Sequence, residues 1–346
     1  MLIEQIASDE VLEAAFEWVC EQRSHYHFNG DIWQLRRWWS EKKLLLQQSI
    51  LNGSYRFREL RRFQANDRMI EWWCSQDALV LKAMAIVLTE HLNPHLSYRC
   101  FHLAGRGGLK GAVREVKAHL DEYQFVFRTD VKKYYASINH HLLMELVGLY
   151  VKDDAVITLL WGYLRRYVSD GGMFLDITQG ISLGCPLSPL IGALFLKPLD
   201  DCMASLLGGL GGGLGCLYVR YMDDWVILAP TRWKLRRAIK AVNRVMADLL
   251  LEKHPDKTFI GRISKGFDFL GYWFSPQGLG VAKKTVERMM AKVTQLYEQG
   301  ADDCRIESYL RHWWRWVRSG VELVLCRGNT REGFGGFFDA YLCAGL

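Results

Sequence analysis

The sequence predicts an α+β fold in which a βαβ-type core is flanked by helical segments. Its 346 residues are half hydrophobic and about a quarter charged, which is typical of a globular protein with two or three subdomains. Short apolar runs rich in β-branched and aromatic residues alternate with amphipathic stretches of helical period. We find no internal repeat and no low-complexity tail.

The first half of the chain combines helices with one ribbon. Residues 1–50 carry tryptophan and leucine at helical spacing, whereas 53–75 alternate basic and aromatic side chains as a two-stranded ribbon does. An amphipathic helix follows at 76–92. After it we expect a glycine-rich basic loop at 105–111 and a helix at 112–123.

The second half continues the alternation of strands and helices. We expect strands at 124–131, within 217–229 and at 267–274, and helices at 139–168, from 188, at 231–254 and from 283 onward.

Composition limits the classes of function. The formal net charge of +6 and the pI of about 8.8 suit a polyanionic partner without proving one. Nine cysteines without any CxxC pair argue against a zinc site or a disulfide framework and favour reduced thiols in the cytoplasm. The N-terminus lacks the basic start of a signal peptide, and no apolar run reaches membrane-spanning length. We therefore expect a soluble cytoplasmic protein with no membrane partner.

The stretch LYVRYMDDWVILA (217–229) holds two adjacent carboxylates, Asp223 and Asp224, between apolar runs. Neighbouring side chains of a strand point to opposite faces, so both acids can serve one site only at a tight hairpin. Their repulsion would be relieved by a divalent cation such as Mg²⁺. Asp130, which ends the strand at 124–131, would be a third ligand. The alternative for such a pair is a solvated turn.

Four segments, in this order, resemble the palm motifs of reverse transcriptases, specifically the bacterial lineages related to group II introns and retrons. TDVKKYYASI (129–138) resembles motif A, LGCPLSP (183–189) motif B and YMDD (221–224) motif C. KTFIGRISKGFDFLGYWF (257–274) is similar to motif D followed by the Phe-Leu-Gly turn of the primer grip. The resemblance covers roughly residues 55–275.

The resemblance implies a right-hand polymerase within the α+β class. Its parts would be an N-terminal helical extension (1–52), fingers (53–123), a palm with an antiparallel sheet (124–278) and a helical thumb (279–346).

The resemblance also implies roles for the acids. Asp130 and Asp223 would hold two Mg²⁺ ions, for which Mn²⁺ can substitute, with the backbone carbonyl of Val131 as a further ligand. Asp224 would be the more peripheral acid. One ion would lower the pKa of the primer 3′-hydroxyl, and the other would neutralise the triphosphate.

The residues that would bind the incoming nucleotide by this resemblance are Arg61, Arg62, Arg68, Tyr135, Gly184 and Lys257. Guanidinium groups suit a triphosphate because they contact it bidentately, and Arg68 is the preferred ligand; a ribbon facing solvent or template backbone is the alternative. Lys257 resembles a lysine that protonates pyrophosphate. The ring of Tyr135 would clash with a ribose 2′-hydroxyl, although a tyrosine of the core is the alternative for it, beside Tyr134.

Motif B departs from the family pattern. Leu183 stands where glutamine usually precedes the glycine, and a Gln179-Gly180 pair lies four residues upstream of it. Either the loop is shifted or the glutamine contact is lost. Gly184 would still let the backbone approach the nascent base pair closely.

The residues that would contact primer and template are Phe269, Leu270, Gly271, Arg311 and Arg315. The first three form the primer-grip turn by resemblance. The two arginines alternate with tryptophans, which suits a nucleic-acid duplex, but an ordinary amphipathic core helix fits nearly as well.

The expected function is RNA-directed DNA synthesis, in which a 3′-end is extended with dNTPs on an RNA template. The expected nucleic-acid partners are this RNA and a DNA primer or cDNA product. A polymerase that makes RNA is disfavoured because Tyr135 would exclude the 2′-hydroxyl. A maturase-like RNA-binding protein of a retroelement, with polymerisation secondary, is the other alternative. For the biological role we favour antiphage defence with a dedicated structured noncoding RNA. The sequence leaves the priming mode and the oligomeric state open.

Overall fold

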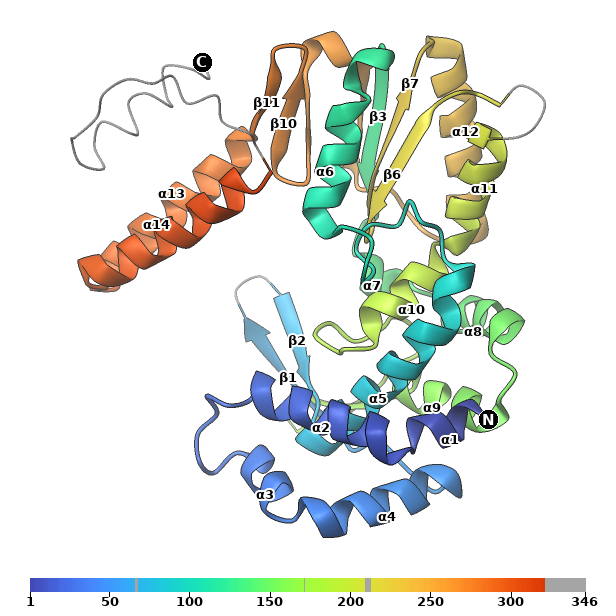
Figure 1. Ribbon diagram of the computed structural model, residues 1–346, viewed down its shortest axis with the longest axis vertical. Coiled ribbons are helices and arrows are strands. Elements are labelled where there is room, and N and C mark those ends of the chain that lie inside the picture. The colour runs from blue at the N-terminus through green and yellow to red at the C-terminus, as the bar shows by residue number, and fades with distance from the viewer. Residues whose placement is uncertain (66–67, 171, 209–212, 321–346) are drawn as a thin grey trace.

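The structure is a computed structural model that describes residues 1–320 except 66–67, 171 and 209–212. Helices and three sheets make up the described part, which confirms the predicted α+β class. Two of the sheets lie in the upper lobe of Figure 1, and the N-terminal helices and the ribbon of β1 (Leu60–Ala65) and β2 (Arg68–Trp72) belong to the lower lobe. None of the helices described is both long and apolar enough to cross a membrane.

The upper lobe is built on a four-stranded antiparallel sheet. Its order is β6 (Leu217–Tyr221), β7 (Asp224–Ala229), β3 (Phe125–Asp130) and β8 (Phe259–Arg262). The predicted hairpin within 217–229 is present, because Tyr221 pairs with Asp224 across a two-residue turn.

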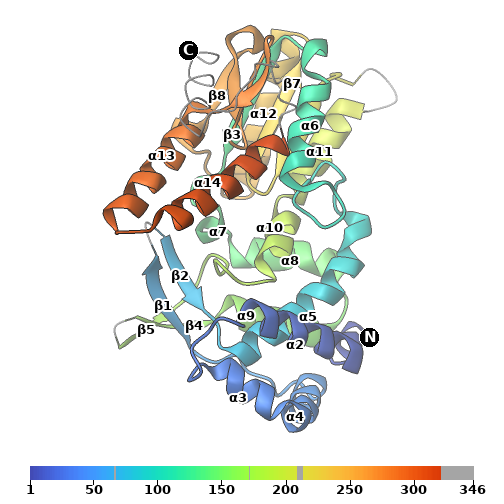
Figure 2. The same cartoon turned by 60° about the vertical axis from the view of Figure 1, so that its left-hand side comes forward.

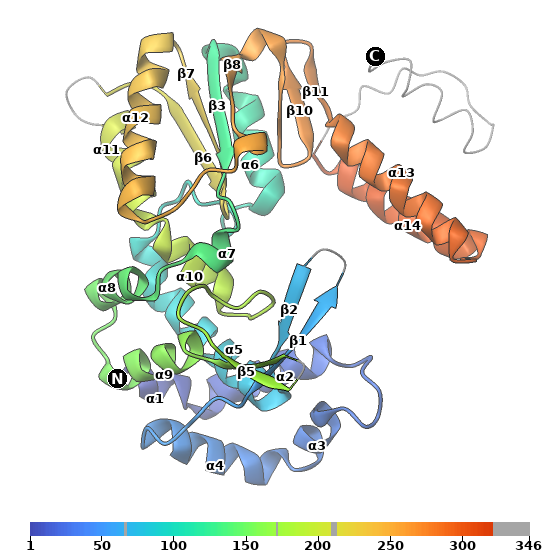
Figure 3. The same ribbon diagram turned by 180° about the vertical axis from the view of Figure 1, so that it is seen from behind.

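Alternation of side chains gives this sheet two apolar faces. Val126 and Val226 lie on one face and pack with helix α6 (Gly108–Ala118) and the small sheet described next. Phe127 and Trp225 lie on the other face, in the large core that includes residues of helix α12 (Arg232–Asp248). Helix α11 (Lys197–Gly208) lies beside α12 on that side, as Figure 3 shows from behind. Because both faces are covered, the strands read as nearly continuous apolar runs.

A small antiparallel sheet leads into the C-terminal helices. It contains β9 (Phe267–Phe269), β10 (Tyr272–Ser275) and β11 (Gly278–Val281). Helices α13 (Lys283–Glu298) and α14 (Asp303–Arg318) follow as a pair that projects to the same side as the ribbon β1–β2 (Figures 1 and 2). The helices expected in the thumb segment are therefore found as far as Arg318, and its residues 321–346 lie outside the described part.

The lower lobe holds the remaining elements. Its helices are α1 (Leu2–Ile6), α2 (Asp9–Gln22), α3 (Asp31–Arg37), α4 (Trp39–Leu51), α5 (Ser75–Leu92), α7 (Tyr134–Ser137), α8 (His140–Tyr150), α9 (Asp154–Leu164) and α10 (Ser188–Phe195), and its strands are β1 (Leu60–Ala65), β2 (Arg68–Trp72), β4 (Tyr167–Asp170) and β5 (Met173–Asp176). Along the chain as a whole, short 3-10 turns occur at Asn93–His95, Leu120–Glu122, Pro255–Lys257 and Ile263–Lys265. Most side chains of α5 are buried, so this helix is the centre of the lobe.

Two predicted elements are corrected by the structure. Residues 139–168 are not one helical stretch: α8 and α9 are followed by strand β4, which joins a sheet ordered β2-β1-β4-β5. Buried Arg166, just before β4, pairs with Glu71 of the ribbon and links the two segments. The predicted loop at 105–111 is shorter than expected. It ends at Gly107, which has a φ of +86°, and α6 begins at the next residue. These elements cross the predicted boundary between 53–123 and 124–278, because β4 and β5 join the ribbon and α6 packs on β6.

A buried ion pair fastens β6 to α11. Arg220 and Asp200 are both fully buried, with Nε donating to Oδ1 at 2.8 Å and Nη2 to Oδ2 at 2.5 Å. The hydroxyl of Tyr218 donates to the same Oδ1 at 2.8 Å. Burial of a charge is tolerated only with such partners, so each member of the pair depends on the other.

We expect Asp200→Ala to lower the free energy of unfolding by about 3–5 kcal/mol, because it leaves the Arg220 guanidinium buried without a counter-charge. The double variant Asp200→Leu/Arg220→Met should regain most of this loss. The neighbouring Asp201→Ala is a matched control: Asp201 is exposed, and its pair with Lys197 should contribute less than about 1 kcal/mol. Urea unfolding measures all three, and equal losses for Asp200→Ala and Asp201→Ala would contradict the buried-pair account.

Candidate active site

The sheet and its hairpin bring three carboxylates together. Asp130 ends β3 and is directly opposite Asp224, the first residue of β7, so both side chains leave the same face. Asp223 occupies the two-residue turn between β6 and β7. Asp130 is only 3% exposed, and the other two are half-buried. The predicted convergence of these acids is thus present in the backbone register.

The three carboxylates perturb one another. Burial raises the pKa of Asp223 to about 8, and the charge and hydrogen bond of Asp130 and the charge of Asp224 act in the same direction. Burial and the charge of Asp130 raise the pKa of Asp224 to about 6, against the opposing charges of Lys257 and Arg128. At neutral pH the protein alone therefore holds a proton in this group of acids.

Oxygen ligands for a divalent cation are available here. Oδ1 of Asp130 is buried and has no hydrogen-bond partner among the described residues, while Oδ2 forms an ion pair with the ammonium of Lys257. As the side chains lie, the described residues contain no ready-made group of three or more His, Cys, Asp or Glu ligands. The donor set is nevertheless the hard-oxygen set that Mg²⁺ prefers, and it fits the ion once Lys257 withdraws from Asp130.

Val131, whose carbonyl is the predicted further ligand, lies in a paired segment at the end of β3. It follows Asp130 directly and forms an isolated bridge with Lys253. The bridge consists of two backbone hydrogen bonds of 2.8 Å, from Lys132 to Glu252 and from His254 to Asp130. The end of β3 is thereby fixed beside the turn that carries Lys257.

The two tyrosines of motif A differ in environment. Tyr134 is 4% exposed, and its hydroxyl donates to the carbonyl of Gly192 at 2.5 Å. Tyr135 is half-buried, its hydroxyl has no partner in the described part of the chain, and burial together with the charge of Asp223 raises its pKa. Tyr134 is therefore the core residue, which leaves Tyr135 free for the predicted contact with the sugar.

The loop that leads into motif B packs against motif A through Gly180. A Cβ on Gly180 would lie 3.0 Å from backbone atoms of both Tyr135 and Ala136, so only glycine fits. Gln179 does not reach the site: its side-chain amide donates to the carbonyl of Ser137 at 2.9 Å. Gly184 has a φ of +93° and faces Ile70 of the ribbon, at the position expected to border the nascent base pair.

The three arginines predicted to bind a triphosphate do not share one environment. Arg61 is exposed. Arg62 is turned to Glu71, with a distance of 3.1 Å from Nη2 to Oε1, and Glu71 also binds buried Arg166. Burial raises the pKa of Glu71, but hydrogen bonds and charge from Arg166 outweigh it and lower that pKa overall. Arg62 is thus partly committed to a structural ion pair, and the side chain of Arg68 lies outside the described residues.

A cavity of about 310 Å³ adjoins motif B. Helix α2 and the ribbon enclose it, and its lining includes Trp18, Tyr26, Trp72 and Gly184. Arg23 stacks against the Tyr26 ring, with its guanidinium carbon 5.5 Å from the centroid. Aromatic and arginine surfaces of this kind suit nucleic-acid bases.

The turn predicted to form the primer grip contacts Trp316, near the C-terminal end of α14. Leu270 and Gly271 have φ values of +49° and +85° and form the two-residue turn between β9 and β10. A Cβ on Gly271 would lie 3.0 Å from the Trp316 ring, so glycine permits this contact. Phe269 is buried in the core beneath the turn.

The arginines predicted to contact the duplex are on the open face of α14. Arg311 and Arg315 are both exposed, and Nη2 of Arg311 lies 2.7 Å from Oε1 of Glu307 on the same helix. Trp316 is half-buried and stacks on Tyr272 at 4.8 Å, with Lys110 of α6 lying 4.1 Å from the Trp316 centroid. On this helix the two arginines therefore face outward, whereas Trp316 packs inward.

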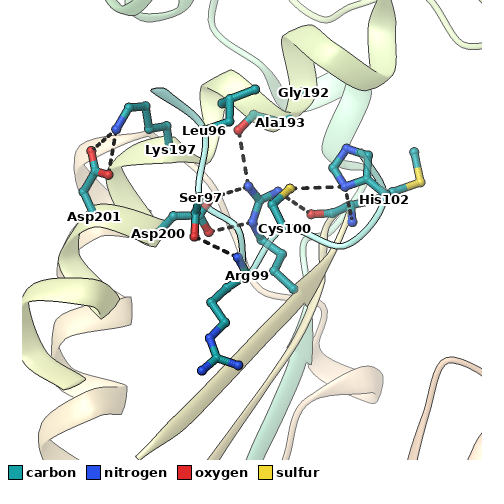
Figure 4. Close-up of polar contacts among 12 residues, drawn as sticks. Leu96, Ser97, Arg99, Cys100, His102, Gly192, Ala193, Lys197, Asp200 and Asp201 are labelled. Carbon is teal, nitrogen blue, oxygen red and sulfur yellow. Dashed lines mark hydrogen bonds and ion pairs between the residues drawn. The ribbon is translucent and has the colours of Figure 1, made fainter. Parts of the chain in front are cut away.

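The turn at Asp223 is supported by three residues that the sequence motifs did not mark. They are His102 and Asp200, both labelled in Figure 4, and Arg220. A charged residue in the middle of the apolar run LYVRY was the available signal for Arg220. No sequence signal near Arg220 indicated its partner Asp200, which is 20 residues away.

The raised pKa of Asp223 predicts a pH-dependent stability. The folded state keeps a proton on Asp223 between the ordinary carboxyl pKa of 3.8 and about 8, so stability falls as pH rises through this window. In EDTA we expect the Tm to decrease from about pH 4 to about pH 8, and Asp223→Asn or added Mg²⁺ to flatten this slope. Asp248→Asn, an exposed carboxylate on α12, is the control. An unchanged slope in Asp223→Asn would contradict the prediction.

Comparison with known proteins gives a consistent result. Residues 64–274 match the family model described as reverse transcriptase (RNA-dependent DNA polymerase). The chain is 23% identical over 265 residues to protein YkfC of Escherichia coli (strain K12), covering 66% of this chain and 70% of YkfC. It is 22% identical over 174 residues to the group II intron-encoded protein LtrA of Lactococcus lactis subsp. cremoris, covering 48% of this chain and 29% of LtrA.

Among solved structures, a chain of a partial Cas6-RT-Cas1–Cas2 complex matches with a TM-score of 0.43 and 20% identity, over 72% of this chain and 41% of that one. The family model spans more than half of the present chain and includes all three acids of the site. This confirms the resemblance predicted from the four motifs: the chain belongs to the reverse transcriptase family.

Proposed function

We propose that this protein is an RNA-directed DNA polymerase that uses Asp130, Asp223 and Asp224 as its catalytic acids. One observation carries the proposal: within the segment that matches the reverse transcriptase family, strand pairing sets Asp130 opposite Asp224 and next to the turn that holds Asp223. A solvated turn, the alternative for an isolated Asp-Asp pair, does not account for a third acid that is 3% exposed.

The acids would hold two Mg²⁺ ions, or Mn²⁺ in their place, through Asp130, Asp223 and the carbonyl of Val131, with Asp224 more peripheral. When bound, such ions lower the pKa of a primer 3′-hydroxyl and neutralise the triphosphate charge. Lys257, released from Asp130, carries an ammonium that can donate a proton to the departing pyrophosphate. Metal binding would therefore replace the Lys257 ammonium on Asp130.

The remaining predicted contacts divide by surface. Tyr135 and Gly184 would border the dNTP, and Arg61 and Arg68 would bind its phosphates. Arg62 is restrained by Glu71. The template strand would run along the ribbon and motif B. The turn 269–271 would hold the primer end, and the exposed arginines of α14 would contact the duplex backbone. In these roles 53–123, 124–278 and 279–346 act as fingers, palm and thumb, and residues 1–52 as an N-terminal extension.

Two biological roles fit this activity in the cytoplasm. Antiphage defence with a dedicated structured noncoding RNA as template is the one we propose. A retroelement or maturase-like role is the second candidate, because one relative, LtrA, is a group II intron-encoded protein. Sequencing the RNA that copurifies with the protein separates them: one discrete noncoding RNA supports the first, and intron RNA the second.

The polymerase is tested by dNTP incorporation on an RNA template with an annealed DNA primer in Mg²⁺. We expect template-directed synthesis, and Asp223→Asn should reduce it by about 10³-fold or more because a metal ligand is lost. Asp248→Asn, with the same chemical change on exposed α12, should retain activity. Full synthesis by Asp223→Asn, or none by the wild type on any primed RNA, would refute the assignment.

The sugar contact of Tyr135 is tested separately. Tyr135→Ala should raise the use of rNTPs relative to dNTPs by about ten- to a hundredfold, because the ring no longer excludes the 2′-hydroxyl. Tyr135→Phe keeps the ring and should keep the wild-type preference. Single-nucleotide kcat/KM values for paired dNTP and rNTP measure this ratio, and an unchanged ratio in Tyr135→Ala would rule out the gate.

A further inference from the structure

The first residue of the turn between β6 and β7 has a backbone conformation that needs support. Met222 has a φ of +55°, in the left-handed region that side chains disfavour by roughly 1–2 kcal/mol. A positive φ at the first turn position matches a type II′ hairpin turn, where glycine is usual. Asp223 follows immediately, so any relaxation of Met222 re-aims a predicted metal ligand.

Both peptide groups that flank the Cα of Met222 are held by hydrogen bonds. The N–H of Met222 donates to Nδ1 of His102 at 3.0 Å. Its carbonyl accepts from Nη1 of Arg220 at 2.8 Å, and Arg220 is itself locked by Asp200. Because φ and ψ are the rotations between these two planar peptide groups, the pair of bonds fixes the conformation of Met222.

The ring of His102 has two further contacts, from Nε2 to Pro189 and from Nδ1 to the Cys100 thiol 3.3 Å away, and the backbone before it is paired. Its Nε2 lies 3.2 Å from the carbonyl of Pro189, an acceptor only, so Nε2 carries the proton and Nδ1 presents a lone pair to Met222. The backbone before the ring is paired with β6: Phe101 donates to the carbonyl of Arg220 at 2.8 Å, and Arg220 donates to that of Arg99 at 3.0 Å. Figure 4 shows this segment beside Arg220's partners.

We propose that His102 is a positioning residue for the catalytic turn: its neutral imidazole holds the N–H of Met222 and so aims Asp223 at the metal site. The same ring links the turn to Pro189 at the start of α10, which couples motif B to motif C. This role rests on the proposed polymerase function. It is distinct from a packing role, because it depends on one nitrogen of the ring.

Two substitutions of His102 test the roles of its ring nitrogens Nδ1 and Nε2 separately. His102→Asn sets an amide oxygen near the position of Nδ1 and keeps an acceptor for Met222. His102→Gln sets an amide nitrogen near Nε2 and keeps the donor to Pro189, but provides no acceptor at the turn. Both remove the aromatic ring, so packing losses are matched, and the Tm of each variant reports them.

The first readout is steady-state dNTP incorporation. Outer contacts that orient a metal ligand typically change activity or metal affinity by 10–100-fold. We expect His102→Gln to lower kcat by about 10–100-fold with little change in the KM for dNTP, and His102→Asn to stay within about threefold of the wild type. Equal kcat losses in the two variants would overturn the positioning role.

The second readout needs no catalysis. Mn²⁺ binding to the full protein without nucleic acid, followed by electron paramagnetic resonance, should weaken about tenfold in His102→Gln and be retained in His102→Asn. Equal affinities in the two variants would refute the proposal. Should the wild type synthesise no DNA, the polymerase assignment fails, and this Mn²⁺ comparison still decides whether His102 positions the turn.

Discussion

Repulsion among three carboxylates is the constraint on which the site depends. Antiparallel pairing sets Asp130 against Asp224, and the shortest hairpin adds Asp223, so the backbone imposes a proximity that the side chains oppose. In the folded protein, a proton held by the acids and the ammonium of Lys257 beside Asp130 reduce this repulsion. Divalent cations would relieve the same repulsion if they bound in place of the Lys257 ammonium and the proton, as proposed above.

The loops around these acids are held by buried charges and by close backbone contacts. Arg220, which is paired with Asp200, donates a hydrogen bond to the motif C turn at Met222. The pair of Arg166 and Glu71 holds the ribbon near motif B. Arg166 also donates to the carbonyl of Gly180 at 3.0 Å, at the glycine that touches motif A. Buried ion pairs contribute little net stability but penalise alternative arrangements, which fits loops that must keep one geometry.

Local patterns predicted much of the fold and of the site. Apolar runs with an alternating face gave the central strands, and the Asp-Asp pair between two of them gave the hairpin, because both signals lie within a few residues. Strand β4 was missed, because its place is set by the pairing of Arg166 with Glu71, 95 residues apart. His102 was missed likewise, since its bond to Met222 joins residues 120 positions apart. Arg62 pairs with Glu71 only nine residues away, but Glu71 is also bound by Arg166, 95 residues further along the chain.

The central claim is that Asp130, Asp223 and Asp224 form one site that binds two ions together with primer, template and dNTP. Counting Mn²⁺ by electron paramagnetic resonance in that complex, with a chain-terminated primer, tests it most directly. The account predicts two ions per chain whose spins are coupled, as expected for ions about 4 Å apart, and loss of the coupled signal in Asp130→Asn. Uncoupled or absent ions in the wild type, or an unchanged signal in Asp130→Asn, would contradict it.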